Sequence, residues 1–261
     1  MRLTWKQKDF EKDIDFILFH QKDGTPVWWH KKLFEVYPDL DYDYCWNSGI
    51  AEEERFNYIT EQMKIQAQKR SDDIAKSIYM FEKAWENVSD KLNNAYSNAF
   101  DNDCSDILND MVAEVSLNPI CPRDIETHTF DICHYFDPQY AITTALHEIT
   151  HFAWFYFWNK HFNDNPSEYD FPNIKWLLSE IVVETLIHNS AINDLIEQPK
   201  YIAYSYFYDM TIKDELIFDT MKKFYLNRKD IYDFMEKSYN FIQSNEPELR
   251  KKINEAESKT Y

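Results

Sequence analysis

The segment "ALHEITHFAW", residues 145–154, places two histidines four positions apart, with a glutamate directly after the first. In an α-helix, residues i and i+4 lie one turn apart on the same face, so His147 and His151 can direct imidazole nitrogens at one metal ion. Glu148 is rotated by about 100° from His147 around the helix, which places its carboxylate beside the ion rather than on it. From that position Glu148 can accept a proton from a water that the ion activates.

A catalytic zinc ion usually has three protein ligands and leaves its fourth position to water. The segment LSEIVVETL carries Glu180 and Glu184, four positions apart in an otherwise apolar run. Buried carboxylates are costly unless a cation faces them. We therefore predict that Glu180 is the third ligand of a Zn²⁺ ion. We predict that Glu184 accepts a hydrogen bond from the second ring nitrogen of His147, because histidine ligands commonly have such a partner.

Two other interpretations of the same residues stay open. His147 and His151 can be core histidines with ordinary hydrogen bonds, and Glu180 can be a member of a buried ion pair. A purely structural zinc ion would require a fourth protein ligand, for which His128, His134 and His188 are candidates. His188 follows Glu184 by one helical turn, so it can instead contact that carboxylate.

Two long helices are expected to carry these residues. Asp137 and Pro138 form a typical helix start, and the sequence then predicts one helix to near His161. A second helix is expected after Pro172, with the continuous apolar character of a buried element. The intervening segment "FAWFYFWNKHFNDNPSEYDFPN" must contain a loop.

The rest of the chain is expected to be mostly helical, with one small sheet. Gly24 and Gly49 are the only glycines, and tight hairpins usually need that residue. Helices are predicted in "KDFEKDIDFILFH", residues 8–20, and after Thr25 and Pro26, where a hairpin is the alternative. Two further helices are predicted in 51–100, separated near Ser71, and two or three in 199–261. Residues 101–137, with "MVAEVSL" and "THTFDICHYF", favour strands. The predicted fold class is α+β, predominantly α-helical.

Composition and charge restrict the partners. The formal net charge of −18 disfavours binding to nucleic acid or to an anionic membrane, because both require clustered basic residues. The first residues show no secretory signal, and the aromatic run "FAWFYFW" is far too short to cross a bilayer. Four widely spaced cysteines are expected to be ordinary buried thiols. A cytoplasmic protein is the expectation.

The HEITH motif followed by a helix with an ExxxE pair resembles the gluzincin branch of the zincin metallopeptidases, the thermolysin-like group. The resemblance covers roughly residues 110–190. It implies His147, His151 and Glu180 as zinc ligands, Glu148 as general base, and Glu184 at the place where the group usually has an Asp. The 28 residues between His151 and Glu180, 152–179, exceed the spacing in the thermolysin-like members.

The resemblance also implies two further features of a peptidase site. The first is a Tyr or His that stabilises the transition state, for which the candidates are Tyr201, Tyr204, Tyr206, Tyr208 and His188. The second is a strand before the active-site helix whose edge pairs with an extended peptide, a place held here by "TFDICHYF". A strand that only packs under the helix is the alternative.

The expected organisation is a helical N-terminal region, 1–100, packed on a zincin-like domain, 101–261, with one continuous domain as the alternative. The predicted function is a zinc-dependent hydrolase, a metallopeptidase acting on a peptide or protein substrate. The alternative is a non-catalytic acidic helical interaction protein that keeps a zincin scaffold. Metal content and chelator-sensitive peptide cleavage separate the two.

Overall fold

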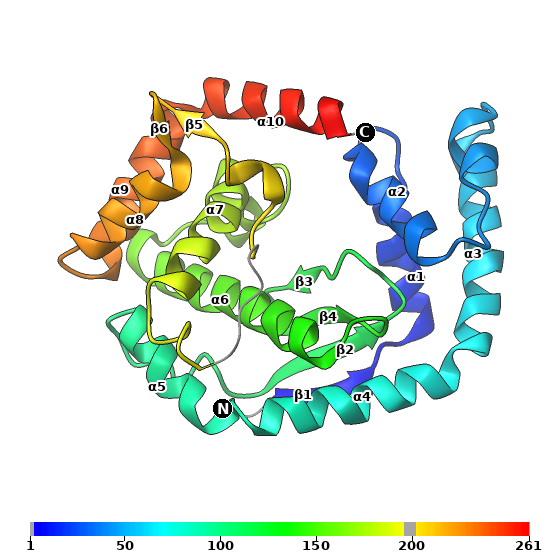
Figure 1. Ribbon diagram of the computed structural model, residues 1–261, viewed down its shortest axis with the longest axis horizontal. Coiled ribbons are helices and arrows are strands. Elements are labelled where there is room, and N and C mark those ends of the chain that lie inside the picture. The colour runs from blue at the N-terminus through cyan, green and yellow to red at the C-terminus, as the bar shows by residue number, and fades with distance from the viewer. Residues whose placement is uncertain (1–2, 196–201, 261) are drawn as a thin grey trace. The chain divides into compact units, whose positions relative to one another are not determined.

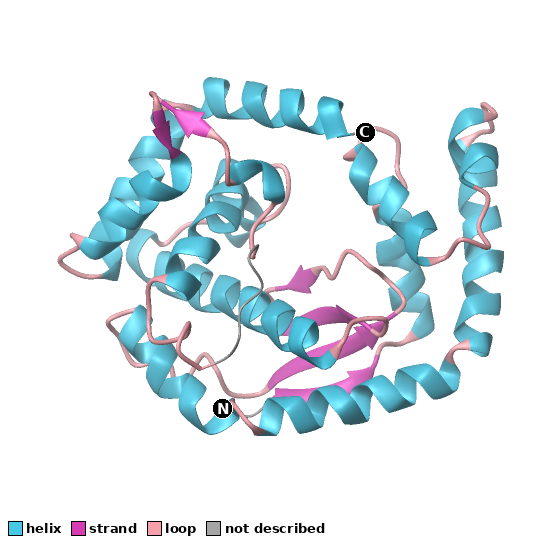
Figure 2. Cartoon of the chain, in the orientation of Figure 1, coloured by secondary structure: helices cyan, strands magenta, loops and turns pink. Residues whose placement is uncertain are grey.

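A computed structural model describes residues 3–195 and 202–260 of the chain. These residues form two compact units, each made of two separate stretches. The unit that we call the sheet unit comprises residues 3–84 and 111–142, and the unit that we call the helical unit comprises 85–110 and 143–260. This division differs from the predicted boundary near residue 100, because the strands belong with the N-terminal helices. The fold is α+β and predominantly helical, as predicted (Figure 2).

The sheet unit contains a four-stranded sheet in the order β1-β2-β4-β3 (Figure 1). Strands β1 (Leu3–Gln7), β2 (Met111–Ser116) and β4 (Thr129–Cys133) are parallel, and the short β3 (Arg123–Asp124) runs antiparallel to β4. In β2 and β4 almost every residue is buried, as expected for central strands covered on both faces. The expected sheet in 101–137 is therefore confirmed, and β1 is an addition that we did not predict.

A buried ion pair joins the two outer parallel strands across β2. Lys8, directly after β1, places Nζ 2.6 Å from both carboxylate oxygens of Asp131 on β4. Each side chain is only 3% exposed, and Lys8 also lies over the ring of Phe16. Because an unpaired charge at this depth would be costly, the pair favours the parallel arrangement of strands far apart in the chain.

Four helices accompany the sheet in this unit. They are α1 (Phe10–Phe19), α2 (Val27–Val36), α3 (Glu52–Lys69) and α4 (Ser71–Glu86, of which residues to 84 belong here), with a short π-helical turn at Asp43–Asn47. Asp9 caps α1 by accepting hydrogen bonds from the Glu11 and Lys12 amides. The prediction of a helix after Pro26 is confirmed. Pro26 itself is the residue before α2, and the Thr25 hydroxyl bonds to backbone oxygens instead of capping it.

The helical unit is organised around α7 (Ile174–His188), in which eleven of fifteen residues are buried. α7 contacts α8 (Ile217–Leu226), α9 (Ile231–Ser244) and the 3₁₀ turn η2 (Pro166–Tyr169). α10 (Glu246–Thr260) follows α9 and contacts the 3₁₀ turn η3 (Ser205–Phe207). The expected C-terminal helices are thus confirmed, and α7 is the buried helix that its apolar sequence predicts.

α6 (Pro138–Phe162) carries the HEITH motif and has the predicted extent. Its first residues belong to the sheet unit, and from Thr143 onward it belongs to the helical unit. In the helical unit, α5 (Ser89–Ala99) is joined to α6, because the Tyr96 hydroxyl donates a 2.8 Å hydrogen bond to the Leu146 carbonyl oxygen. With α5, residues 51–99 contain three helices rather than the predicted two.

A small hairpin, β5 (Thr211–Ile212) with β6 (Glu215–Leu216), turns without glycine. Lys213 and Asp214 both adopt positive φ, at 52° and 64°, a conformation that usually draws on Gly or Asn. The low glycine content therefore disfavours hairpins without excluding them.

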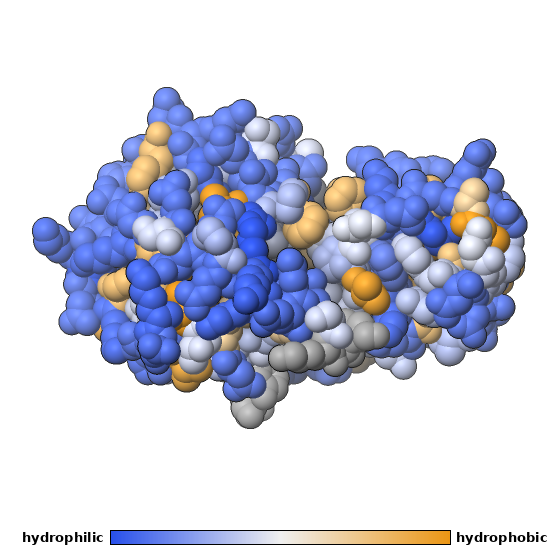
Figure 3. Space-filling view, turned by 90° about the horizontal axis from the view of Figure 1, so that it is seen from above, coloured by the Kyte–Doolittle hydropathy of each residue, from blue (hydrophilic) through white to orange (hydrophobic). Residues whose placement is uncertain are grey.

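The visible face of the molecule is largely hydrophilic, with isolated hydrophobic residues (Figure 3). Large exposed side chains such as Tyr79, Tyr135 and Leu226 are distributed over different elements. Within the described residues, no helix combines the length and apolar character needed to cross a membrane.

Candidate metal site

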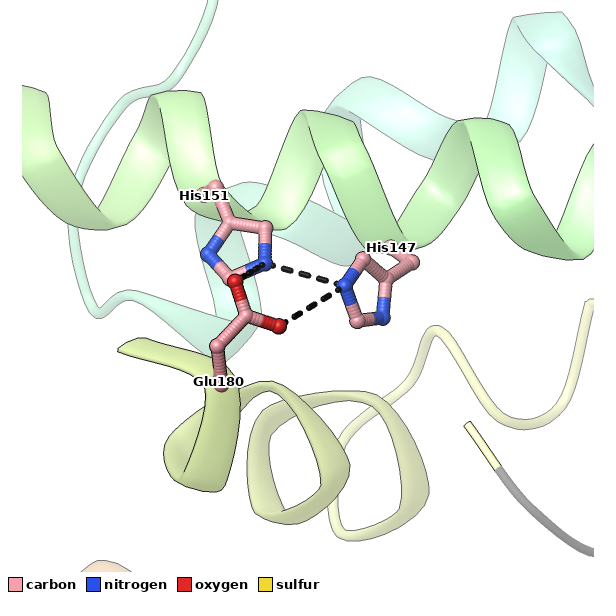
Figure 4. Close-up of side chains that lie close together, drawn as sticks. All are labelled: His147, His151 and Glu180. Atoms are coloured by element: carbon pink, nitrogen blue, oxygen red, sulfur yellow. Dashed lines mark hydrogen bonds and ion pairs between the residues drawn. The ribbon is translucent and has the colours of Figure 1, made fainter. Parts of the chain in front are cut away.

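His147 and His151 lie on one face of α6, as their spacing predicts (Figure 4). Their Nε2 atoms are 3.0 Å apart. Tyr96 holds the helix at the residue directly before each histidine, because the Leu146 carbonyl oxygen accepts its hydrogen bond and the Thr150 hydroxyl contacts the same Tyr96 oxygen at 3.1 Å. Both imidazoles are therefore directed at one point by a well-packed stretch of helix.

Glu180 of α7 completes the group. One carboxylate oxygen lies 3.5 Å from His147 Nε2 and the other lies 3.5 Å from His151 Nε2. The side chains of His151 and Glu180 are nearly inaccessible, whereas that of His147 is 15% exposed. The three groups converge from two helices, and 28 residues of chain, 152–179, separate His151 from Glu180.

The separations within the group suit a zinc ion. Tetrahedral Zn²⁺ with bonds of about 2.0–2.2 Å to nitrogen and oxygen holds its ligand atoms about 3.3 Å apart. The measured 3.0, 3.5 and 3.5 Å lie close to that value. Among the described residues, His, Cys, Asp and Glu side chains form one group of three whose ligand atoms are close enough to share an ion, and that group is His147, His151 and Glu180. His128, His134 and His188, the possible fourth ligands, do not belong to it.

Glu148 borders this group without being part of it. Its Oε1 lies 3.9 Å from His147 Nε2, and the residue is 5% exposed. Glu148 does not belong to the group whose ligand atoms all lie within 4.8 Å of one another, yet its carboxylate is within reach of a small molecule bound beside that group. It lies on α6 beside the two histidines, as the spacing of the motif predicts.

Glu184 has different partners from those predicted. One carboxylate oxygen contacts His188 Nδ1 at 2.6 Å, and the other accepts a hydrogen bond from the Tyr208 hydroxyl. The predicted hydrogen bond with His147 is not among the described contacts of Glu184. The reason is geometric, because Tyr208 from the η3 segment and His188 from the next turn of α7 both reach this carboxylate.

The candidates for a residue that stabilises the transition state differ in their surroundings. Tyr208 is engaged with Glu184, and its oxygen also accepts the Ile202 amide at 2.8 Å. Burial raises the pKa of Tyr206, and the negative charges of Glu257 and Glu180 add to that effect. Tyr204 stacks on Tyr206 with ring centroids 5.6 Å apart. Tyr201 lies outside the described residues.

The strand "TFDIC" does not offer a free edge along its whole length. β3 pairs with β4 at Thr129 and Phe130, and the Asp131 amide donates a 2.8 Å hydrogen bond to the Pro122 carbonyl oxygen. Residues 122–124 therefore occupy the edge where we predicted that a peptide could pair. The prediction fails for residues 129–131, because a short return strand covers them.

Comparison with family models, with curated proteins and with solved structures finds no match for this chain. The resemblance to gluzincins therefore depends on the motif residues and on their geometry.

Proposed function

We propose that the protein is a zinc-dependent hydrolase that cleaves peptide bonds. The observation that carries the proposal is the convergence of His147, His151 and Glu180 at 3.0–3.5 Å, with the Glu148 carboxylate beside them. These three residues would hold the ion. When bound, zinc would act as a Lewis acid, lowering the pKa of a water ligand and polarising the substrate carbonyl.

Glu148 is the residue that would move the proton. Its carboxylate, 3.9 Å from His147 Nε2, would accept a proton as water attacks the peptide carbonyl carbon and would deliver that proton to the leaving amine nitrogen. The surrounding burial keeps bulk water from competing for the carboxylate, since Glu148 is only 5% exposed. His147 is the most accessible of the ligands, so substrate would approach on its side.

The three-ligand set favours a catalytic ion over a structural one, because a structural zinc site normally has four protein ligands. Cytoplasmic location is part of the same proposal. It is supported by the four cysteines, which are all buried thiols, since oxidising compartments favour disulfides.

The first test measures metal content and cleavage together. Purified protein should contain close to one zinc per chain by mass spectrometry, and it should cleave a mixed peptide library in a chelator-sensitive way. Zinc binding without chelator-sensitive cleavage would contradict the peptidase proposal and favour a non-catalytic interaction protein.

The second test isolates Glu148. Glu148→Gln keeps the size of the side chain but removes its ability to take up a proton, so turnover should fall by about 10²- to 10⁴-fold. Zinc content and melting temperature should stay close to those of the wild type. Cleavage at the wild-type rate in a zinc-loaded Glu148→Gln protein would exclude the assigned role.

A further inference from the structure

The segment between α6 and α7, residues 163–173, lies within the 28 residues that separate His151 from Glu180, and we call it the insert. It begins where Asn163 adopts a φ of 53° and ends α6, a typical use of Asn. It then forms η2, whose first turn is capped by the Asn165 side chain through the Ser167 amide. The insert is thus a folded element rather than an irregular loop.

A single carboxylate of the insert joins the two helices that supply the metal ligands. Asp164 Oδ2 accepts a 2.8 Å hydrogen bond from Trp158 Nε1 on α6 and forms a 2.6 Å ion pair with Lys175 Nζ on α7. Lys175 is 9% exposed and also pairs with Glu168. Because one oxygen bonds both helices, a shift of either helix along its axis would break one of the two contacts.

The charges in this bridge are maintained at neutral pH. Burial opposes ionisation of Asp164, but the hydrogen bonds from Lys175 and Trp158 outweigh it and keep the pKa of the carboxyl below its usual value. Burial likewise opposes the charge on Lys175, and the bonds to Asp164 and Glu168 outweigh it and raise the pKa of the amine. The bridge is therefore a charge-assisted hydrogen bond, which is stronger than a neutral one.

A second contact leads from the insert to a metal ligand. Tyr169 of η2 is 2% exposed and stacks on Phe155 with ring centroids 4.3 Å apart and an interplanar angle of 16°. Phe155 in turn lies nearly parallel to the ring of His151, with centroids 6.5 Å apart. The Tyr169 hydroxyl accepts a 3.3 Å hydrogen bond from Asn159, which keeps the tyrosine ring in place. The ring of His151 is thus packed against Phe155, and Phe155 is packed against Tyr169 of the insert.

We propose that the insert is a positioning element of the metal site, acting on Glu180 through Asp164 and Lys175 and on His151 through Tyr169. The inference rests on the proposed metal site. Lys175 precedes Glu180 by five residues, about 7.5 Å of helix, and Trp158 follows His151 by seven, about 10 Å. Over these short distances the bridge through Asp164 fixes the position of α7 along α6. It thereby also fixes the 3.5 Å distances from the Glu180 carboxylate oxygens to the Nε2 atoms of His147 and His151.

The competing explanation is that the insert only stabilises the fold, in which case its loss would lower the melting temperature but leave metal affinity unchanged. The comparison variants are Asp164→Asn and Asp101→Asn. Asp101 forms an ion pair of similar length with Arg228 in the same unit, at 2.7 Å, and is remote in sequence from the ligands. Asn has nearly the same size and shape as Asp, so each variant removes one carboxylate charge and its ion pairing with little change in packing.

The readout is the zinc dissociation constant at 25 °C, measured by competition with a chelating dye, together with the melting temperature of the metal-free protein. Asp164→Asn should weaken zinc binding by about tenfold or more, the scale found for residues that support metal ligands. Asp101→Asn should change it by less than about twofold for a similar change in melting temperature. Equal zinc affinity of the two variants would overturn the proposal.

Variants at Tyr169 provide an independent arm if Asp164→Asn does not fold. Tyr169→Phe keeps the ring stack, so it should retain most of the zinc affinity and the visible absorption spectrum of the cobalt-loaded protein. Tyr169→Ala should weaken binding and alter that spectrum. A cobalt spectrum of Tyr169→Ala that is unchanged, like that of Tyr169→Phe, would contradict the proposal. Zinc binding by the wild type without peptide cleavage would overturn only the proposed function, whereas no metal binding at all would overturn both.

Discussion

Glu180 and Glu184 lie one helical turn apart on α7, yet their surroundings differ. Glu180 faces two imidazole nitrogens at 3.5 Å, whereas Glu184 is held by His188 and Tyr208. The buried Glu180 and the partly exposed Glu184 therefore have different partners on the same helix. The first completes the group of candidate metal ligands, and the second ties the segment that follows α7 back to that helix.

This difference can be measured with a matched pair of variants. Glu180→Gln replaces a charged ligand by a weak neutral one, so the zinc dissociation constant should rise by more than about 100-fold, beyond the range for residues that only support a ligand. Glu184→Gln should raise it by less than about tenfold, because it leaves all three ligands in place. Equal losses in the two variants, measured by competition with a chelating dye, would show that Glu184 also binds the ion.

The residues of the candidate metal site could be predicted from the sequence because helical spacing is local. His147 and His151 share a face wherever that segment is helical, and an acidic residue in the buried run around Glu180 requires a cation. The partners of Glu184 could not be predicted in the same way. Tyr208 lies 24 residues further along the chain, and no periodic pattern in the sequence predicts the turn that brings it to Glu184.

At the scale of elements, α1 is joined to the end of β2 by Asp13. Its Oδ2 accepts a 2.7 Å hydrogen bond from the Leu117 amide, directly after the strand, and the residue is 3% exposed. Burial raises the pKa of Asp13, and the hydrogen bond from Leu117 and the charge of Lys8 lower it. The effect of burial is the larger one, so the pKa is about 6. The packing of this helix on the sheet is thus linked to pH.

The sign of that link follows from the raised pKa. A carboxyl whose pKa is higher in the folded state than in the unfolded state contributes stability at low pH, and this contribution is lost as the pH rises through about 6. The advantage of the wild type over Asp13→Asn in unfolding free energy should therefore shrink by up to about 3 kcal/mol between about pH 4 and pH 7. Urea titrations of both proteins measure it. A difference that grows with pH would show that Asp13 is ionised throughout.

Elements that depend on distant pairing are the ones that the sequence does not predict. Helices with clear starts, such as α6 after Asp137 and Pro138, were predicted with nearly correct bounds. Strand β1 was not, because its buried residues Leu3 and Trp5 gain their strand conformation by pairing with β2, more than 100 residues away. β3 was missed for a related reason, since its two residues become a strand only against β4.

At the scale of the whole molecule, all three candidate ligands belong to the helical unit, and none to the sheet unit. A ligand that binds only the folded state stabilises the unit that holds it, by about 2.7 kcal/mol at 100 times its dissociation constant. Zinc at that concentration should therefore slow hydrogen exchange of the α7 amides by about 100-fold.

Amides of β2 should exchange at the same rate with and without zinc. Hydrogen exchange followed by mass spectrometry, on peptides covering α7 and β2, gives both values in one experiment. The Glu180→Gln protein serves as the control, because it keeps both units but lacks one ligand. Equal protection of β2 and α7 would show that the two units unfold as one.

The two stretches that make up each unit alternate along the chain, and this order affects synthesis. Residues 85–110 are synthesised before β2, yet the rest of their unit starts only at residue 143. Tyr96, for example, bonds to a carbonyl oxygen 50 residues further on. A nascent chain that has reached β4 can therefore complete its sheet while α5 still exposes its apolar side, so premature termination in this region would release a fragment prone to aggregation.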